Sequence, residues 1–222
     1  MIMTKSFDDE WERIHADRVW GMYPSESVIR FIARNYYKYD RKSIKILDFC
    51  CGSGSNTWYL AHEGFDVYAF DGSTSAIKRA KERFKEEGLQ AHFEVKDALN
   101  CDYEDDFFDC IIDNVGVYAN RYENIRKMYE TIFLKLKYGG KLFTTSFSLN
   151  TTGYETGVEI EKNTYKGIKE GTLAGRGIAH LWEGNDLFEL LRGVGFTNIK
   201  IDRMLWTDQG NTIEQLLVQC QK

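Results

Sequence analysis

Apolar and polar residues form blocks whose spacing alternates between that of a strand and that of a helix. Short apolar runs predict buried strands at residues 44–49, 65–70, 91–95, 107–113 and 141–147. Before and between these runs, apolar residues recur at helical spacing and predict helices at residues 25–36, 56–63, 73–88 and 122–137. Strands that alternate with helices become parallel neighbours joined by right-handed crossovers. The first two thirds of the chain therefore predict a doubly wound α/β sheet that is covered on both faces.

The last third of the chain has a different pattern. Residues 150–177 are polar, glycine-rich and poorly periodic, which predicts a long excursion or lid with little packing to hold it rigid. A helix is expected at residues 183–195, followed by strands at residues 196–205 and 212–220. The short joint from Thr207 to Gly210 leaves no room for a crossover helix, so these two strands should be antiparallel neighbours.

Length and composition are those of an ordinary globular protein, with 43% hydrophobic residues among 222. This length suits one α/β domain. We therefore expect a single domain over residues 1–222, with an N-terminal cap helix region at 1–40 and the excursion at 150–180. The formal net charge of −5 disfavours a general binder of nucleic acid, because phosphate contacts need a surplus of Lys and Arg.

Cysteine and histidine show no metal-binding pattern. The five cysteines include no C-x-x-C pair, and the four histidines are scattered without ligand spacing, so no metal site is predicted. We interpret the cysteines as reduced thiols of a cytoplasmic protein. No apolar run reaches membrane-spanning length, and residues 1–12 lack the apolar core of a signal peptide. A soluble, intracellular protein without a membrane partner is expected.

The first predicted strand ends in a glycine-rich turn. Asp48 lies in that strand, and Gly52 and Gly54 follow it just before a predicted helix. Glycines at such a place let backbone N–H groups approach a ligand at the positive end of the helix. Asp48 either takes part in this site or only binds the amides of its own loop.

Further acidic residues stand at the ends of the next three strands. Asp71 comes 17 residues after Gly54, where a carboxylate can accept hydrogen bonds from both hydroxyls of an adenosine ribose. Asp97, with Ala98, is placed to receive an adenine amino group, although a turn or cap role is an equal reading. Asp113 and Asn114 follow the fourth strand beside the same crevice.

The turn does not match the motifs of two common nucleotide sites. Thr57 stands where a dinucleotide fingerprint has its third glycine, which argues against NAD and FAD. The chain also has no G-x-x-x-x-G-K-[ST] motif, which excludes a P-loop nucleotide site.

These motifs resemble the class I S-adenosylmethionine-dependent methyltransferases over nearly the whole chain. The run from Ile46 to Gly54 resembles their first motif, and Cys50 stands where that family usually has a glycine. The resemblance implies a Rossmann-like, seven-stranded sheet that is mostly parallel with an antiparallel C-terminal strand, and it implies S-adenosylmethionine as cofactor. The implied cofactor-binding residues in the strand ends and turns are Asp48, Cys50, Gly52, Gly54, Asn56, Asp71, Gly72, Ser73, Asp97, Ala98, Asp113 and Asn114.

The chain has a single proline, Pro24, and this count excludes motifs that are typical of some classes of methyl acceptor. Methyltransferases that act on exocyclic amines of nucleobases usually carry an Asn/Asp-Pro-Pro-aromatic run, and cytosine-C5 enzymes use a Pro-Cys nucleophile. This chain has Asp113-Asn114-Val115-Gly116 at the first place and no Pro-Cys anywhere. We therefore expect methyl transfer to an oxygen or nitrogen of a small-molecule acceptor, with no nucleic-acid partner.

The candidate catalytic residues are His180 and Tyr118. His180 lies at the end of the excursion, where the predicted lid would bring it towards the acceptor as a base, or it only packs near the next helix. Tyr118, after the fourth strand, is a second candidate base or orients the acceptor. Trp20 and Tyr23 precede the first predicted helix and either close over the cofactor or form a hydrophobic staple.

Two alternatives to the active methyltransferase stay open. One is a cofactor-binding scaffold without chemistry of its own, which the acids at Asp71 and Asp97 disfavour. The other is an NAD-dependent oxidoreductase, which Thr57 and the C-terminal hairpin disfavour.

Overall fold

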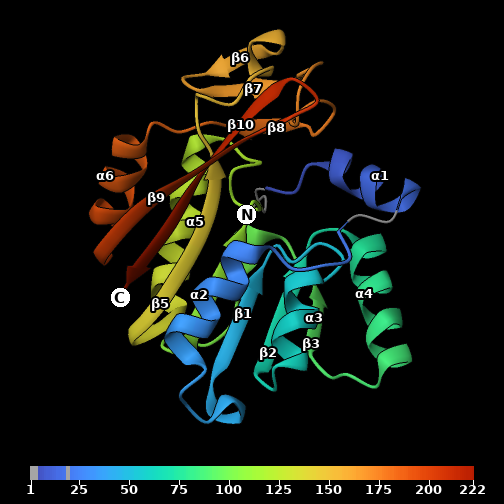
Figure 1. Cartoon of the computed structure of the whole chain (residues 1–222), viewed down its shortest axis with the longest axis vertical. Coiled ribbons are helices and arrows are strands. Elements are labelled where there is room, and N and C mark those ends of the chain that lie inside the picture. Colours follow the sequence, from blue (N-terminus) through green and yellow to red (C-terminus); the bar gives the residue numbers. More distant parts are fainter. Residues whose placement is uncertain (1–4, 19–20) are drawn as a thin grey trace.

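The structure is a computed structural model that describes residues 5–18 and 21–222. Its centre is a seven-stranded sheet with the order β3-β2-β1-β4-β5-β10-β9 (Figure 1). The parallel strands are β1 (Lys45–Phe49), β2 (Asp66–Asp71), β3 (His92–Val95), β4 (Phe108–Asn114) and β5 (Leu136–Phe147). The antiparallel pair is β9 (Thr197–Asp208) and β10 (Asn211–Gln221). The predicted doubly wound sheet with an antiparallel C-terminal strand is confirmed.

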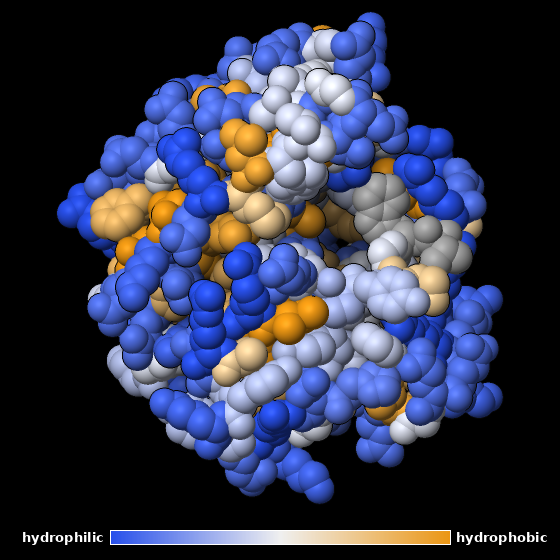
Figure 2. All heavy atoms as spheres, in the orientation of Figure 1, coloured by the Kyte–Doolittle hydropathy of each residue, from blue (hydrophilic) through white to orange (hydrophobic). Residues whose placement is uncertain are grey.

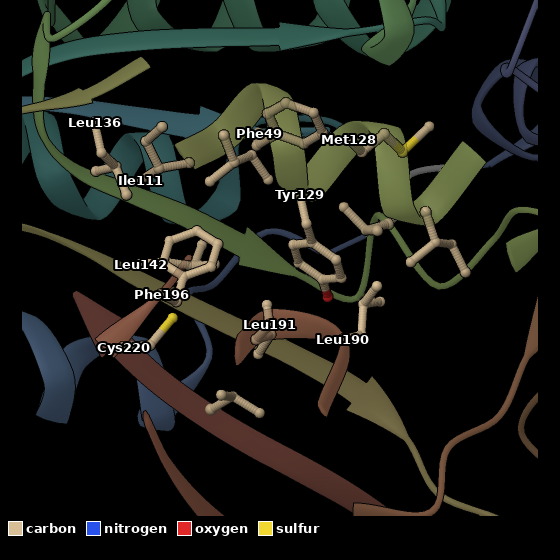
Figure 3. Close-up of a cluster of buried hydrophobic side chains, with 14 of the residues drawn as sticks. Phe49, Ile111, Met128, Tyr129, Leu136, Leu142, Leu190, Leu191, Phe196 and Cys220 are labelled. Atoms are coloured by element: carbon tan, nitrogen blue, oxygen red, sulfur yellow. The ribbon is translucent and has the colours of Figure 1, made fainter. Parts of the chain in front are cut away.

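Helices cover both faces of this sheet. They are α2 (Glu26–Tyr36), α3 (Ser55–His62), α4 (Thr74–Glu87), α5 (Tyr122–Lys135) and α6 (Gly184–Val194), whereas α1 (Asp9–Asp17) packs against α4. Ile46 of β1 packs in one buried cluster with α2 and α3, whereas its neighbour Leu47 packs in another with α5 and α6. Figure 3 shows part of this second cluster, where Met128 and Tyr129 of α5 gather with Leu142 and Leu191. Burial on both faces explains why the strands are continuous apolar runs rather than alternating ones.

Two boundaries differ from the predictions. β5 begins at Leu136, five residues early, and contains the glycine pair that was expected to precede it. The early part is held because the Gly139 amide donates to the Lys222 carbonyl at the far end of the chain. α1 was not predicted, because only Ile14 and His15 of this helix are buried and no apolar periodicity marks it.

The excursion at 150–177 is an ordered structure and not the loosely packed segment that its glycines predict. It contains β6 (Val158–Glu161) and β7 (Thr164–Lys166), which pair with β8 (Ile178–His180) in a three-stranded antiparallel sheet at the top of Figure 1. Ile168 and Leu173 are buried in one apolar cluster with Tyr118 and Phe147. The prediction was wrong because these anchors are isolated in the sequence and become a core only with distant partners.

Short 3₁₀ turns complete the described elements: η1 (Arg41–Ser43), η2 (Ala98–Asn100) and η3 (Tyr154–Thr156). Within residues 5–18 and 21–222, no helix combines the length and the apolar character needed to cross a bilayer.

Candidate active site

A cavity of about 310 Å³ opens at the carboxyl ends of β1, β2 and β4. Figure 2 shows the hollow on this face of the molecule. Its volume lies in the range of small-molecule sites. The predicted residues that line it are Tyr23, Cys50, Gly52, Asn56, Asp71, Gly72, Ala98, Asn114 and Tyr118. The fold therefore brings nine predicted site residues from separate turns into one cavity.

The glycine turn, residues 50–54, depends on left-handed backbone at three positions. Cys50, Gly52 and Gly54 have φ values of 57°, 54° and 77°. The turn is held from two sides, because the Cys51 amide donates to the Phe70 carbonyl and the Gly52 amide to Asp71 Oδ2 at 2.9 Å. Gly52 faces the cavity, where a Cβ would lie 3.4 Å from the His15 ring.

Cys50 adopts a conformation that normally favours glycine. It is accommodated because Gly116, in the loop after β4, has no side chain: a Cβ there would lie 2.6 Å from the Cys50 Cβ. The departure from glycine at position 50 is thus matched by a glycine 66 residues later in the chain.

Asp71 presents a carboxylate to the cavity. Its Oδ1 accepts the Ser73 amide at 2.8 Å and its Oδ2 accepts the Gly52 amide at 2.9 Å. Burial raises the pKa of this carboxyl above its ordinary value, and the two amide bonds oppose that rise. A carboxylate oxygen accepts about two hydrogen bonds, so each oxygen retains capacity for a ligand hydroxyl.

Three predicted cofactor-binding side chains hold the loops together and do not line the cavity. Asp48 accepts the amide and hydroxyl of Thr57, and burial raises its pKa to about 7. Asp113 accepts the amides of the loop that follows it and the Thr144 hydroxyl, and burial raises its pKa to about 6. Ser73 caps α4 by accepting the Ala76 amide. In this structure the three side chains support the loops, and their predicted contact with the cofactor stays a prediction.

Gly54 also points away from the cavity. A Cβ there would lie 3.2 Å from the Ala80 Cβ of α4 and 3.6 Å from the Phe93 ring. This glycine is needed for the close approach of α4 and for its left-handed φ, and not to leave space for the cofactor.

Asp97 does not line the cavity either. Its Oδ2 accepts the amides of Ser6 and Phe7 at 2.8 and 2.9 Å, and its Oδ1 accepts the Ser6 hydroxyl and the Leu99 amide. Four bonds occupy the acceptor sites of a carboxylate. The carboxylate of Asp97 is therefore occupied by Ser6, Phe7 and Leu99, while the adjacent Ala98 does face the cavity.

An N-terminal segment, residues 6–17, supplies cavity residues that sequence reasoning missed. Ser6, Phe7, Asp8, Trp11 and His15 all line the cavity. The only sequence signal for them is the aromatic content of the segment from Trp11 onward. Of the two aromatics predicted nearby, Tyr23 lines the cavity, with 76% of its surface exposed, and Trp20 lies outside the described residues.

The two predicted catalytic residues are separated. Tyr118 lines the cavity and is 2% exposed. Burial raises its pKa above the ordinary value, and the charge of Arg176 and a hydrogen bond from its guanidinium oppose part of that rise. Arg176, in the glycine-rich loop before β8, lines the same cavity and was not predicted.

His180 lies outside this cavity. β8 places its ring beside Trp182, 4.3 Å between centroids, where its Nδ1 shares a hydrogen bond with the Thr164 hydroxyl at 2.6 Å. It lines a different cavity of about 760 Å³, between α5, α6 and the small sheet. Burial lowers its pKa to about 4, so it is a neutral, packed imidazole. The prediction that the excursion carries His180 to the acceptor is not supported by this arrangement.

Two residues of the cavity wall carry buried polar atoms without a hydrogen-bond partner among the described residues. These atoms are His15 Nδ1 and Ser53 Oγ. Unpaired buried polar atoms are costly, and a polar ligand relieves that cost. Together with Asp71 and the open face of Gly52, they fit a ligand that carries hydroxyl and charged groups, as S-adenosylmethionine does.

Comparison with known proteins supports the same fold and domain. Residues 46–140 match the model of the methyltransferase domain family. A 37-residue stretch is 51% identical to an uncharacterized methyltransferase of Synechocystis sp. and covers 17% of this chain and 18% of that protein. Residues 46–140 are thus similar to a methyltransferase domain, in agreement with the predicted resemblance.

Solved structures show the fold over a greater length. An S-adenosylmethionine-dependent methyltransferase of Methanosarcina mazei superposes with a TM-score of 0.71 at 23% identity, over 91% of this chain and 99% of that one. Phosphoethanolamine N-methyltransferase 2 of Haemonchus contortus, with S-adenosylhomocysteine bound, gives 0.70 at 18% identity, over 96% of this chain and 56% of that one. A 1,6-didemethyltoxoflavin-N1-methyltransferase of Burkholderia thailandensis gives 0.64 at 18% identity, over 89% and 79%.

Proposed function

We propose that this protein transfers the methyl group of S-adenosylmethionine to an oxygen or nitrogen of a small-molecule acceptor. The observation that carries the proposal is one cavity in which Asp71 and the glycine turn lie together with Tyr118 and Arg176. Asp71 and the glycine turn suit a nucleoside cofactor, whereas Tyr118 and Arg176 supply polar groups that can bind an acceptor.

Asp71 would hold the ribose hydroxyls of the cofactor, while Gly52 and Ser53 of the glycine turn would contact its amino-acid portion. When bound, the cofactor supplies a methyl group on a positively charged sulfur, which is already activated for displacement. The chain itself then has to position the acceptor and exclude water. The N-terminal segment helps to exclude water because it closes one side of the cavity.

Tyr118 would orient the acceptor. A phenol is protonated near pH 7 and burial raises the pKa of Tyr118 further, so it would act as a hydrogen-bond donor to the acceptor rather than as a base. Arg176 fixes the phenol by its hydrogen bond and places a positive charge beside the acceptor. His180 has no place in this proposal, because it lies outside the cavity.

Two walls of the site favour a small acceptor. The N-terminal segment and the loop of Arg176 border the cavity and limit the space beside the cofactor. Two structural neighbours have small molecules in their names, phosphoethanolamine and 1,6-didemethyltoxoflavin, and so the fold accommodates acceptors of this size.

Two experiments test the proposal against its alternatives. Calorimetric titration with S-adenosylmethionine, S-adenosylhomocysteine and NAD should show binding of the first two only. Release of S-adenosylhomocysteine should then be measured with a panel of small amines, alcohols and acids, with Tyr118→Phe as the matched variant. NAD binding alone would overturn the proposal, and cofactor binding without turnover of any acceptor would favour the inactive scaffold.

A further inference from the structure

Gly72 follows Asp71 in the cavity wall, and its backbone conformation does not require a glycine. It is absent from the glycines with positive φ, unlike Gly52 of the glycine turn. The reason for the glycine is space: a Cβ at position 72 would lie 2.2 Å from Cδ2 and 2.4 Å from Cγ of Phe7. The ring of Phe7 thus fills the volume that a side chain at position 72 would occupy.

The backbone around Phe7 is held firmly in this place. The amides of Ser6 and Phe7 both donate to Asp97 Oδ2, and the Ser6 hydroxyl donates to Oδ1 at 2.6 Å. Asp97 is half-buried, and its carboxylate has no acceptor site left for another donor. The acid at the end of β3 therefore serves as the anchor of the N-terminal segment.

A second anchor lies at the other end of the segment. Glu12 accepts the hydroxyls of Ser73 and Ser75 at 2.6 Å each, at the start of α4. Arg79 of α4 donates to the Ala16 carbonyl at 2.9 Å. Because hydrogen bonds hold both of its ends, the segment of residues 6–17 forms a fixed wall of the cavity.

We propose that Phe7 is a cofactor-binding residue whose ring forms the apolar wall against which the adenine of S-adenosylmethionine stacks. Asp71 binds the ribose in the proposed function, and the base attached to that ribose must lie close by, beside Gly72 and Ala98. Phe7 is the aromatic side chain at Gly72, and a base stacks well on an aromatic ring. The cavity stays open with the ring in place, so the ring is a wall and not a plug.

The test uses S-adenosylhomocysteine and 5′-methylthioadenosine, which share the adenosine and differ in the amino-acid portion. We expect Phe7→Ala to raise the dissociation constants of both ligands by a similar factor of about ten, the equivalent of about 1.4 kcal/mol. Gly72→Leu should also weaken both, because the new side chain displaces the ring. In the double variant Phe7→Ala/Gly72→Leu, the leucine occupies the vacated volume and should recover part of the affinity.

Three controls accompany these variants. Phe7→Leu keeps an apolar group but removes the aromatic face, so its effect should be intermediate. Arg13→Ala alters the solvent-facing side of α1, where Arg13 pairs with Glu10, and should leave both affinities unchanged. The melting temperature of each unliganded variant separates a loss of fold from a loss of binding.

Several results would overturn the inference. Unchanged or tighter binding by Phe7→Ala would show that the ring does not support the base. A loss seen with S-adenosylhomocysteine but not with methylthioadenosine would place Phe7 beside the amino-acid portion. If the losses of affinity in the double variant are additive, the Phe7 ring and the space at Gly72 do not depend on each other.

Because the inference rests on the proposed function, wild-type protein is titrated first. If wild type does not bind S-adenosylhomocysteine, the proposed cofactor is wrong. If wild type binds normally and the Phe7 variant is unaffected, only the role of Phe7 is wrong.

Discussion

The glycine turn and the N-terminal segment are two walls of one cavity, yet they are built in different ways. The glycine turn takes its shape from left-handed backbone at alternate positions, 50, 52 and 54, and is contiguous with β1 and α3. The N-terminal segment takes its place from side-chain contacts with Asp97 and α4, which lie more than 50 residues away in the sequence. A wall of the first kind is visible as a motif, whereas a wall of the second kind depends on which distant residues the fold brings near.

The largest effect is expected for Asp71→Ala, which removes the carboxylate that faces the cavity and accepts the Gly52 amide of the glycine turn. We expect the dissociation constant of S-adenosylhomocysteine to rise by roughly 100-fold, because two charge-assisted hydrogen bonds to the ribose are lost. Calorimetric titration measures the change. Asp66→Ala, at the other end of β2, is the matched control and should bind normally. Equal affinities of the two variants would contradict the assignment of Asp71.

The next prediction separates backbone strain from ligand space in the glycine turn. Gly52→Ala and Gly64→Ala both place a side chain at positive φ, which costs about 1–2 kcal/mol. A Cβ at Gly52 faces the cavity and His15, whereas a Cβ at Gly64 meets nothing within 4 Å. Both variants should lose stability in urea, but only Gly52→Ala should lose affinity for S-adenosylhomocysteine. Normal binding by Gly52→Ala would show that this turn does not contact the cofactor.

Acidification should affect the two walls in opposite directions. Burial raises the pKa of Asp48 and Asp113, behind the glycine turn, to about 7 and about 6. Their protonated forms are favoured by folding, so this contribution to stability grows as the pH falls from about 7 towards 4. Glu12 and Asp97 anchor the N-terminal segment; burial raises the pKa of each, and hydrogen bonds outweigh that effect and lower it overall. Their contribution is present above the ordinary carboxyl pKa and is lost as the pH falls through the lowered value.

Hydrogen exchange read by mass spectrometry at about pH 7 and at about pH 2, well below the ordinary carboxyl pKa, tests this contrast once the rates are corrected for intrinsic exchange. Residues 6–17 should lose protection at the lower pH while β1 and α3 retain it. Asp48→Asn should reduce the gain in stability that the glycine turn shows on acidification. Glu12→Gln should reduce the loss of protection that residues 6–17 show on acidification. A parallel response of both walls would contradict the difference in their construction.

A smaller effect is expected at Cys50. Cys50→Gly relieves the left-handed strain, whereas Cys50→Ala keeps it and removes the thiol in the same way. The glycine variant should be more stable than the alanine variant by about 1 kcal/mol, as measured by urea unfolding. If alanine is equally stable, the backbone at position 50 carries no strain.

The smallest effect on cofactor binding is expected for His180→Ala. Its ring lies in the second cavity, so the affinity for S-adenosylhomocysteine should stay within experimental error of wild type. Stability should fall by about 1 kcal/mol or more, because the Thr164 hydroxyl loses its buried partner. A strong loss of turnover at normal cofactor affinity would instead restore the role that the sequence predicted for His180.

Local patterns were enough to predict the sheet and its helices. Apolar runs such as residues 107–113 indicate a buried strand from a few consecutive residues. Ser73 and Gly88 cap the two ends of α4, and this capping involves only residues that are close in the sequence. The same locality made Asp71 and Gly52 recognisable, because both stand at the end of a strand where ligands bind in this fold class. Strand boundaries were less exact at β5, because a distant contact with Lys222 extends that strand.

Side-chain roles within the site required the three-dimensional arrangement. Asp71, Asp97 and Asp113 look equivalent in the sequence, each being an acid at a strand end, but only Asp71 faces the cavity. The N-terminal segment saturates Asp97, and the loop after β4 surrounds Asp113. Phe7, His15 and Arg176 carry no motif, since their places depend on Gly72, the glycine turn and Tyr118 respectively. A residue's chain neighbours determine whether it is in a strand or a turn, whereas its solvent exposure and hydrogen-bond partners depend on segments that approach from elsewhere in the chain.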